Sequence, residues 1–216
     1  GTNVAFKWRA QTGTIVLPTP TADAEAHGVS ADGSIVVGRY NNPGEGTRAV
    51  YWDAQRQMHD LGSIAGSTTH SAQCVSDDGR IIGGTAGPET GPARQAFVWT
   101  PETGMRPASD YFAERGVVLP VGYRAYECSS VSGNGRVFGV RVYPPDGGAA
   151  NISGIAVLGI TCPADFNRDG GVDGSDVEAF FDPWANGLPI ADVNEDGGVD
   201  GADVELFFQS WEAGGC

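Results

Sequence analysis

The stretch Asp165-Phe-Asn-Arg-Asp-Gly-Gly-Val-Asp-Gly-Ser-Asp176 recurs 27 residues later as Asp192-Val-Asn-Glu-Asp-Gly-Gly-Val-Asp-Gly-Ala-Asp203. In both copies oxygen-bearing side chains occupy positions 1, 3, 5, 9 and 12, and glycine occupies position 6. This spacing lets a twelve-residue loop wrap a calcium ion, with a sharp turn at the glycine and a carbonyl ligand at position 7. Four carboxylates in one loop repel one another, so we expect each loop to bind a hard divalent cation.

The sequence therefore predicts two calcium ions, one in each EF-hand-type loop. The predicted ligands of the first ion are Asp165, Asn167, Asp169, the Gly171 carbonyl, Asp173 and Asp176; those of the second are Asp192, Asn194, Asp196, the Gly198 carbonyl, Asp200 and Asp203. The alternative is a solvated acidic turn, because Asp, Asn and Gly are also common in ordinary turns. Position 12 is Asp in both loops, where the common EF-hand has a bidentate Glu, so we expect tighter or monodentate coordination there.

Each loop is followed by apolar residues at helical spacing. The residues at i, i+3, i+4 and i+7 are Val177, Phe180, Phe181 and Trp184 after the first loop, and Val204, Phe207, Phe208 and Trp211 after the second. This spacing predicts one short amphipathic helix after each loop. No comparable pattern precedes either loop.

A loop followed by a single helix, repeated twice, resembles the dockerin family from Cys162 to Cys216. The bracketing Cys162-Pro-Ala-Asp and Gly214-Gly-Cys216 are similar to the GC-type dockerin found at the C-terminus of exported planctomycete-like bacterial proteins. The resemblance implies two half-EF-hands with pseudo-twofold symmetry that bind a cohesin-like partner or serve a cell-surface anchoring machinery. Positions 10 and 11, often Ser or Thr in cellulosomal dockerins and used there to contact cohesin, are Gly174-Ser175 and Gly201-Ala202.

The cysteines predict an oxidising compartment, and hence a secreted or cell-surface protein. The chain has four cysteines and no Cys-x-x-Cys motif, which argues against a zinc site. The antiparallel halves that the resemblance implies would bring the module's ends together, so we expect a Cys162–Cys216 disulfide. Cys74 and Cys128 form either a second disulfide or two buried thiols.

Charge is concentrated at the C-terminal end. From Cys162 onward the sequence has 13 of the chain's 27 acidic residues and one base, Arg168, so this segment carries −12 of the net charge of −14. The asymmetry predicts two modules, 1–161 and 162–216, and neither offers the basic surface that nucleic-acid binding requires. No stretch reaches the ~18 apolar residues of a membrane span. No signal peptide is visible, and because the chain opens at Gly1 without Met, we interpret it as a mature or truncated piece of something longer.

The first module contains a weaker repeat. Ala5-Phe-Lys-Trp8, Ala49-Val-Tyr-Trp52 and Ala96-Phe-Val-Trp99 recur at 44 and 47 residues, and alternate with Val29-Ser-Ala-Asp-Gly33, Val75-Ser-Asp-Asp-Gly79 and Val131-Ser-Gly-Asn-Gly135. Periods in the forties with glycine turns are typical of four-stranded propeller blades. We expect units at about 4–40, 48–85 and 95–143 and a closing strand at 154–158. The strands of the first unit are expected at 4–10, 14–18, 24–30 and 34–40.

This pattern resembles the HAF repeat of exported bacterial proteins, although the residue before Ala-Phe is not His. Three units fall short of the four to eight blades of a closed propeller, so further blades are expected before Gly1. We expect Trp8, Trp52 and Trp99 to be blade-core residues rather than a sugar-stacking platform. The third unit carries an insertion at 109–121, in which 110–116 is expected to form one or two helical turns.

The fold class expected from the sequence is therefore a mainly β N-terminal region of incomplete, propeller-like four-stranded repeats, followed by a small α-helical, dockerin-like double EF-hand module. No catalytic motif is present: the chain lacks a Gly-x-Ser-x-Gly elbow, a His-Glu-x-x-His helix and a phosphate-binding glycine loop. The favoured function is a non-catalytic extracellular binding or surface-display protein. The alternative is a subunit of a polysaccharide-degrading glycoside hydrolase, with its catalytic part in the propeller or upstream of Gly1.

Overall fold

The chain divides into two compact units, Gly1–Leu158 and Gly159–Cys216. The computed structural model describes residues 3–21, 23–88, 93–145, 152–157, 162–167, 171–194 and 196–213. Antiparallel sheets make up the first unit, and short helices make up the second. The expected fold class is confirmed at this level: the protein is mainly β, with several small sheets and few helices.

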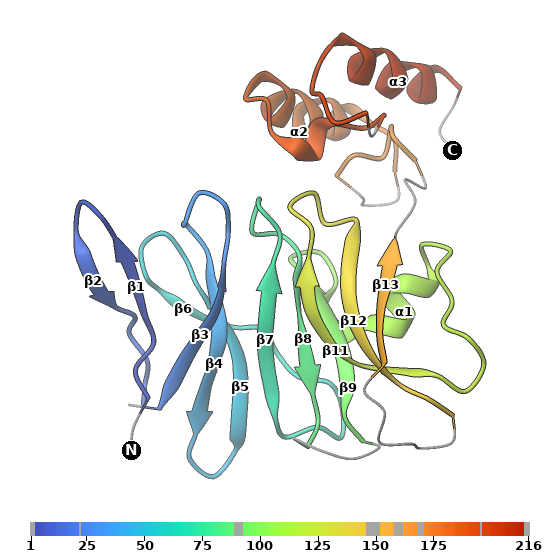
Figure 1. Ribbon diagram of the computed structural model, residues 1–216. Coiled ribbons are helices and arrows are strands. Elements are labelled where there is room, and N and C mark those ends of the chain that lie inside the picture. Colours follow the sequence, from blue (N-terminus) through green and yellow to red (C-terminus); the bar gives the residue numbers. More distant parts are fainter. Residues whose placement is uncertain are drawn as a thin grey trace. The chain divides into compact units, whose positions relative to one another are not determined.

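The sheets of the first unit follow one another in chain order (Figure 1). The first sheet contains β1 (Phe6–Arg9) and β2 (Gly13–Val16); the second contains β3 (Ala24–Val29), β4 (Val36–Asn42), β5 (Gly46–Trp52) and β6 (Met58–Asp60). The third contains β7 (His70–Val75), β8 (Ile82–Ala86), β9 (Gln95–Thr100) and β10 (Gly104–Pro107); the fourth contains β11 (Arg124–Val131), β12 (Val137–Tyr143) and β13 (Ile152–Val157). The second and third sheets are four-stranded meanders, as expected of propeller-like blades.

The predicted repeat units do not coincide with these sheets. All four strands expected in unit 4–40 exist, but β1 and β2 belong to one sheet and β3 and β4 to the next. The reason is that β4 continues through a tight turn into β5 and pairs with it along its whole length, from Val36↔Trp52 to Asn42↔Gly46. The predicted closing strand corresponds to β13, except for Leu158, which lies outside the described residues.

The Val-Ser-x-Asp-Gly motif builds the turn between the first two strands of a sheet. The buried Ser30 hydroxyl donates to Asp32 Oδ1 (2.7 Å), and it accepts a hydrogen bond from the Ile35 N–H (2.9 Å). Asp32 also accepts from the Ser34 N–H, and this bond is the main cause that lowers the pKa of its carboxyl. Gly33 has φ +70°, a conformation that glycine adopts without strain. The same bonds recur in the other two copies, so the motif is structural.

Apolar side chains fill the spaces between consecutive sheets. Trp52 is fully buried in a cluster with Leu17, the residue that follows β2, and its indole N–H donates to the Pro18 carbonyl (2.7 Å). Phe97 on β9 is likewise buried in a cluster that contains Val37 of its preceding sheet. Each four-stranded sheet thus presses one face onto the sheet before it in the chain.

The expectation that all three motif tryptophans are core residues is wrong for Trp8. Trp52 is 0 % exposed and Trp99 is partly buried, whereas Trp8 is 65 % exposed. The physical reason is that the described residues place no sheet against the face of β1 on which Trp8 lies.

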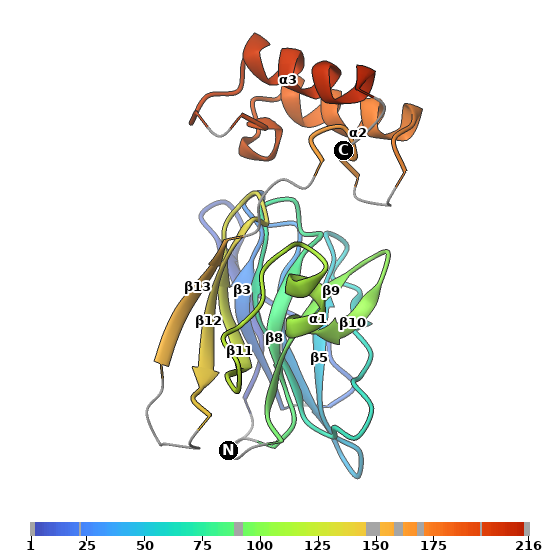
Figure 2. The ribbon, with the colours of Figure 1, turned by 90° about the vertical axis from the view of Figure 1, so that its right-hand side faces the viewer.

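The insertion of the third unit forms helix α1 (Ala108–Ala113), somewhat earlier than the predicted 110–116. Figure 2 shows α1 beside β9, β10 and β11, and it contacts all three strands. Its buried Phe112 meets Phe138 of β12 edge to face, with ring centroids 5.1 Å apart. The helix therefore adds to the apolar core between the third and fourth sheets.

Cys74 and Cys128 are buried free thiols rather than a second disulfide. The Cys74 Sγ lies 3.7 Å from the carbonyl oxygen of Cys128, so it faces the backbone of β11. Burial raises the pKa of Cys74 to about 12. A thiol this hard to ionise is a packing group, because the thiolate is the reactive form.

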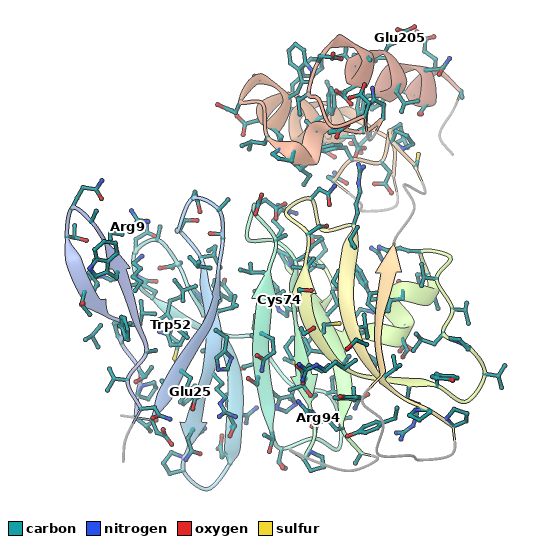
Figure 3. The ribbon with its side chains drawn as sticks, viewed as in Figure 1. Arg9, Glu25, Trp52, Cys74, Arg94 and Glu205 are labelled. Atoms are coloured by element: carbon teal, nitrogen blue, oxygen red, sulfur yellow. The ribbon has the colours of Figure 1, made fainter. Side chains whose placement is uncertain are left out.

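An ion network around Glu25, which is labelled in Figure 3, ties β3 to β4. Glu25 accepts from Arg39 Nε and Nη2 (3.0 and 3.2 Å), from Asn3 Nδ2 (2.8 Å), and lies 3.1 Å from His27 Nε2. The hydrogen bonds from Arg39, followed by the one from His27, lower the pKa of Glu25 from 4.5 to about 2.

This shift predicts a pH dependence of stability. A carboxyl whose pKa is lowered by folding stabilises the fold at pH values above the pKa of the unfolded chain, here 4.5. This stabilisation is lost as the pH falls toward the folded-state pKa of about 2. Glu25→Gln should lower the free energy of unfolding of the first unit at pH 7 by about 1 kcal/mol, because the site is partly exposed. It should also flatten the fall in stability between pH 5 and 2. Urea titrations at each pH measure both effects, with the exposed Glu45→Gln as control; superimposable curves for Glu25→Gln and the parent would contradict the prediction.

The second unit contains α2 (Gly174–Ala185), a 3-10 turn at Pro189–Ala191 and α3 (Gly201–Glu212). The two helices expected after the loops are therefore present. Phe180 and Phe207, equivalent residues of the two repeats, are fully buried and stack with ring centroids 4.5 Å apart and planes 8° apart. Contact between equivalent residues indicates that an approximate twofold axis relates the two halves. None of the helices in the described ranges is long and apolar enough to cross a membrane.

Candidate metal centre

The aspartate at position 12 closes each loop. In the first loop, Asp176 accepts from the N–H of Asn167 (2.9 Å) and of Asp173 (3.0 Å). In the second, Asp203 accepts from the N–H of Asn194 (3.2 Å) and of Asp200 (2.9 Å), and also from that of Val193 (2.8 Å). Both carboxylates are 0 % exposed. Positions 3 and 9 are thus held to position 12 by the same bonds in both repeats.

The aspartate at position 9 starts the helix that follows. Asp173 Oδ1 accepts from the Ser175 N–H (2.8 Å), and Asp200 Oδ1 accepts from the Ala202 N–H (2.8 Å). Together with the position 12 aspartates they form a capping box at each helix. The Ser175 hydroxyl, followed by its N–H, lowers the pKa of Asp173. The calcium-loop pattern alone does not predict this role, although aspartates three residues apart before an apolar run are a signal of it.

The aspartate at position 1 holds one buried oxygen in each loop. Oδ1 of Asp165 and Oδ1 of Asp192 are buried and have no hydrogen-bond partner within the described part of the chain. Both residues also have other interactions, and Asp192 Oδ2 accepts from the Gly197 N–H (3.0 Å). A buried carboxylate oxygen without a proton donor suits a cation.

Positions 3, 5 and 7 are seen best in the second loop. Asn194 Nδ2 donates to Asp196 Oδ2 (3.0 Å), and Asp196 Oδ1 accepts from the Gly198 N–H (2.9 Å). Gly197, at position 6, has φ +90°, as the predicted sharp turn requires. In the first loop, Asn167 Nδ2 donates to Ser175 Oγ (2.6 Å), Gly171 is exposed, and Asp169 and Gly170 lie outside the described residues.

The predicted ligands that the structure describes do not all come together. Across residues 162–167, 171–194 and 196–213, no three Asp, Glu, His or Cys side chains converge into a cluster that could hold a metal ion. Asn194 and Asp196, both predicted metal ligands, form hydrogen bonds with each other instead. The donor set nevertheless fits calcium by its chemistry: it consists of oxygens only, as a hard cation of six to eight ligands requires.

Cys162 is disulfide-bonded. Its expected partner, Cys216, lies outside the described residues. A structural disulfide agrees with an oxidising compartment.

A separate cavity of about 610 Å³ lies beside α1 in the first unit, with Asp110, Tyr123 and Arg124 in its lining. Glycoside hydrolysis commonly needs two carboxylates facing the scissile bond. Asp110 is the one acid among the described residues that line this cavity, so the described part of the lining offers one carboxylate.

No family model matches the chain, and no curated protein matches it. Among solved structures, it is similar to a putative TolB from Agrobacterium tumefaciens, with TM-score 0.43 and 15 % identity over 62 % of this chain and 43 % of that one. It is also similar to TolB from Acinetobacter baumannii, with TM-score 0.40 and 13 % identity over 69 % of this chain and 36 % of that one. The chain thus spans less than half the length of either protein, and similarity this low assigns it no function or partner.

Proposed function

We propose that the second unit is a calcium-dependent attachment module of the dockerin type on a non-catalytic, extracellular bacterial protein. One calcium ion binds each loop through the predicted oxygens. The folded pair of helices then attaches the protein to a cohesin-like partner or to the cell-surface anchoring machinery. The sheets of the first unit are then the part of the protein that is displayed outside the cell.

The observation that carries the proposal is the burial of Asp176 and Asp203. Each is 0 % exposed, and each meets backbone N–H groups of its own loop. Buried charges in proteins are paired with opposite charges or coordinate metals. The sequence from Cys162 onward supplies a single base against 13 acids, so side chains cannot balance the loops. Two dications can.

The outer faces of α2 and α3 are the surface proposed for the partner. Glu178 and Glu205 are equivalent, exposed residues of the two helices, and Glu205 is labelled in Figure 3. Phe208, three residues after Glu205 on α3, is 36 % exposed. Because an approximate twofold axis relates the halves, a partner can meet either helix in the same way. Loss of one contact residue then leaves the equivalent site usable.

Capture of envelope proteins from the source bacterium tests this function. The immobilised full chain should retain a partner in calcium and release it in chelator. Glu178→Ala and Glu205→Ala together should abolish retention, each alone should weaken it, and Glu45→Ala in the first unit should leave it unchanged. Retention that survives both chelator and the double variant would contradict attachment through these helices.

A further inference from the structure

The connection after the last strand of the third sheet is longer than the equivalent connections of the first two sheets. It spans residues 108–123, whereas the others span 17–23 and 61–69. The added residues form α1 and the loop that follows it, and α1 packs beside β9, β10 and β11 (Figure 2). Binding residues often lie on such connections, which a rigid sheet holds in place.

The first residue of this connection also differs between the repeats. It is Leu17 after the first sheet and Leu61 after the second, and each leucine is buried in one cluster with the motif alanine of its own repeat. The equivalent residue after the third sheet is Ala108. Its shorter side chain leaves room beside the motif alanine Ala96, which lines the cavity of about 610 Å³.

Three elements contribute polar side chains to this cavity. Asp110 comes from α1, Gln95 from the start of β9 and Arg124 from the start of β11. The loop after α1 adds the apolar side chains of Val118 and Leu119. Pockets that hold small ligands commonly have volumes of about 300–1,000 Å³ and combine apolar walls with a few polar groups. The cavity has both properties.

Aromatic rings hold the two arginines that line the cavity. The guanidinium of Arg94, which is labelled in Figure 3, lies 5.1 Å from the ring centroid of Tyr126. That of Arg124 lies 5.8 Å from the ring centroid of Tyr143. The two tyrosine rings stack on each other with centroids 4.3 Å apart. Groups positioned in this way before a ligand arrives cost less to order when it binds.

The charges at the described part of the cavity balance. Arg94 forms an ion pair with Glu127 (2.6 Å), and the other two charged side chains, Asp110 and Arg124, have opposite signs. An anionic ligand would meet Asp110, and a cationic ligand would meet Arg124. A purely apolar ligand would take both groups out of water and return no hydrogen bonds. This balance favours an uncharged ligand that carries both hydrogen-bond donors and acceptors.

We propose that this cavity binds a neutral oligosaccharide. The sugar hydroxyls donate to the carboxylate of Asp110 and accept from Arg124 and Gln95. The C–H faces of a sugar ring pack against the ring of Tyr123 and against Val118, which is 78 % exposed at the cavity. The site lies in the first unit and is independent of the calcium loops.

Isothermal titration of the full chain with neutral hexasaccharides tests the proposal. The probes are cellohexaose, xylohexaose, mannohexaose, laminarihexaose and maltohexaose. At least one of them should bind with a Kd of about 1 mM or tighter. A hexamer of galacturonic acid has a similar size but carries negative charges, and it should bind more weakly than that neutral probe.

Three variants locate the binding. Asp110→Ala and Arg124→Ala should each weaken it about tenfold or more, because each removes hydrogen bonds to a charged group. Ala113→Trp, at an exposed residue of α1 that lines the cavity, should abolish it by filling the space. Asp182→Ala in the second unit is the control and should leave the affinity unchanged. Far-UV dichroism and melting temperatures establish that each variant is folded.

Absence of binding by every neutral probe would overturn the proposal. Binding that persists unchanged in folded Asp110→Ala, Arg124→Ala and Ala113→Trp would also overturn it, because the sugar would then lie elsewhere on the protein. Tighter binding of the galacturonic acid hexamer than of any neutral probe would contradict the assignment of an uncharged ligand.

Discussion

Removal of calcium is expected to unfold the unit Gly159–Cys216 and leave the sheets of the first unit intact. The apolar core of the second unit is small: its fully buried members include Phe180, Ala191 and Phe207. A module of this size commonly needs a metal ion or disulfides for stability. Without calcium, the four carboxylates of each loop also repel one another with no metal ion between them. The test is a titration with chelator. Fluorescence of Trp184 and Trp211 follows the second unit, and far-UV circular dichroism of the sheets follows the first.

One substitution sharpens this prediction. Asp203→Ala removes a buried carboxylate that accepts three backbone N–H groups, so it should lower the stability of the second unit by about 3 kcal/mol or more. Asp182→Ala, an exposed aspartate of α2 outside the loops, is the matched control and should have little effect. A second unit that melts at the same temperature with calcium and with chelator would contradict the prediction.

Gly84→Ala in β8 is expected to have the largest effect on the first unit. A Cβ at this position would lie 2.1 Å from the carbonyl oxygen of Ser71 and 2.7 Å from the buried ring of Phe97. Neither the backbone of β7 nor a ring packed between two sheets can move away at low cost. We expect a loss of more than about 3 kcal/mol in the free energy of unfolding.

Gly154→Ala in β13 is the control, because the nearest atom to its Cβ would be 4.0 Å away. Thermal melts of the two variants and the parent, followed by far-UV dichroism, measure the difference. Equal melting temperatures for Gly84→Ala and Gly154→Ala would show that the close approach at β8 does not limit stability.

The repeated motifs were sufficient to predict the strands of the first unit but not their grouping into sheets. Glycine turns were expected within each repeat, and Asp32-Gly33 forms one, since such a turn depends on neighbouring residues alone. Whether β2 pairs with β3, or β4 with β5, depends on contacts between more distant residues. The motif predicts the same position in a strand for Trp8, Trp52 and Trp99. Their burial depends on whether another sheet packs against that strand, and the motif does not contain this information.

The spacing of the C-terminal loops predicted the turn at Gly197 and the helices after both loops. It did not predict that Asp176 and Asp203 would bond the backbone of their own loops, because a carboxylate at position 12 serves equally as metal ligand and as hydrogen-bond acceptor. The calcium ligation itself remains a prediction from the donor pattern.

Calcium stoichiometry tests the central claim most directly. Isothermal titration of the full chain, stripped of metal, should give two calcium ions per chain. Asp165→Ala and Asp192→Ala should each leave one, the double variant none, and Asp182→Ala two. Absence of calcium binding by the parent chain, or a stoichiometry unchanged by the double variant, would contradict the assignment of the two loops as calcium sites.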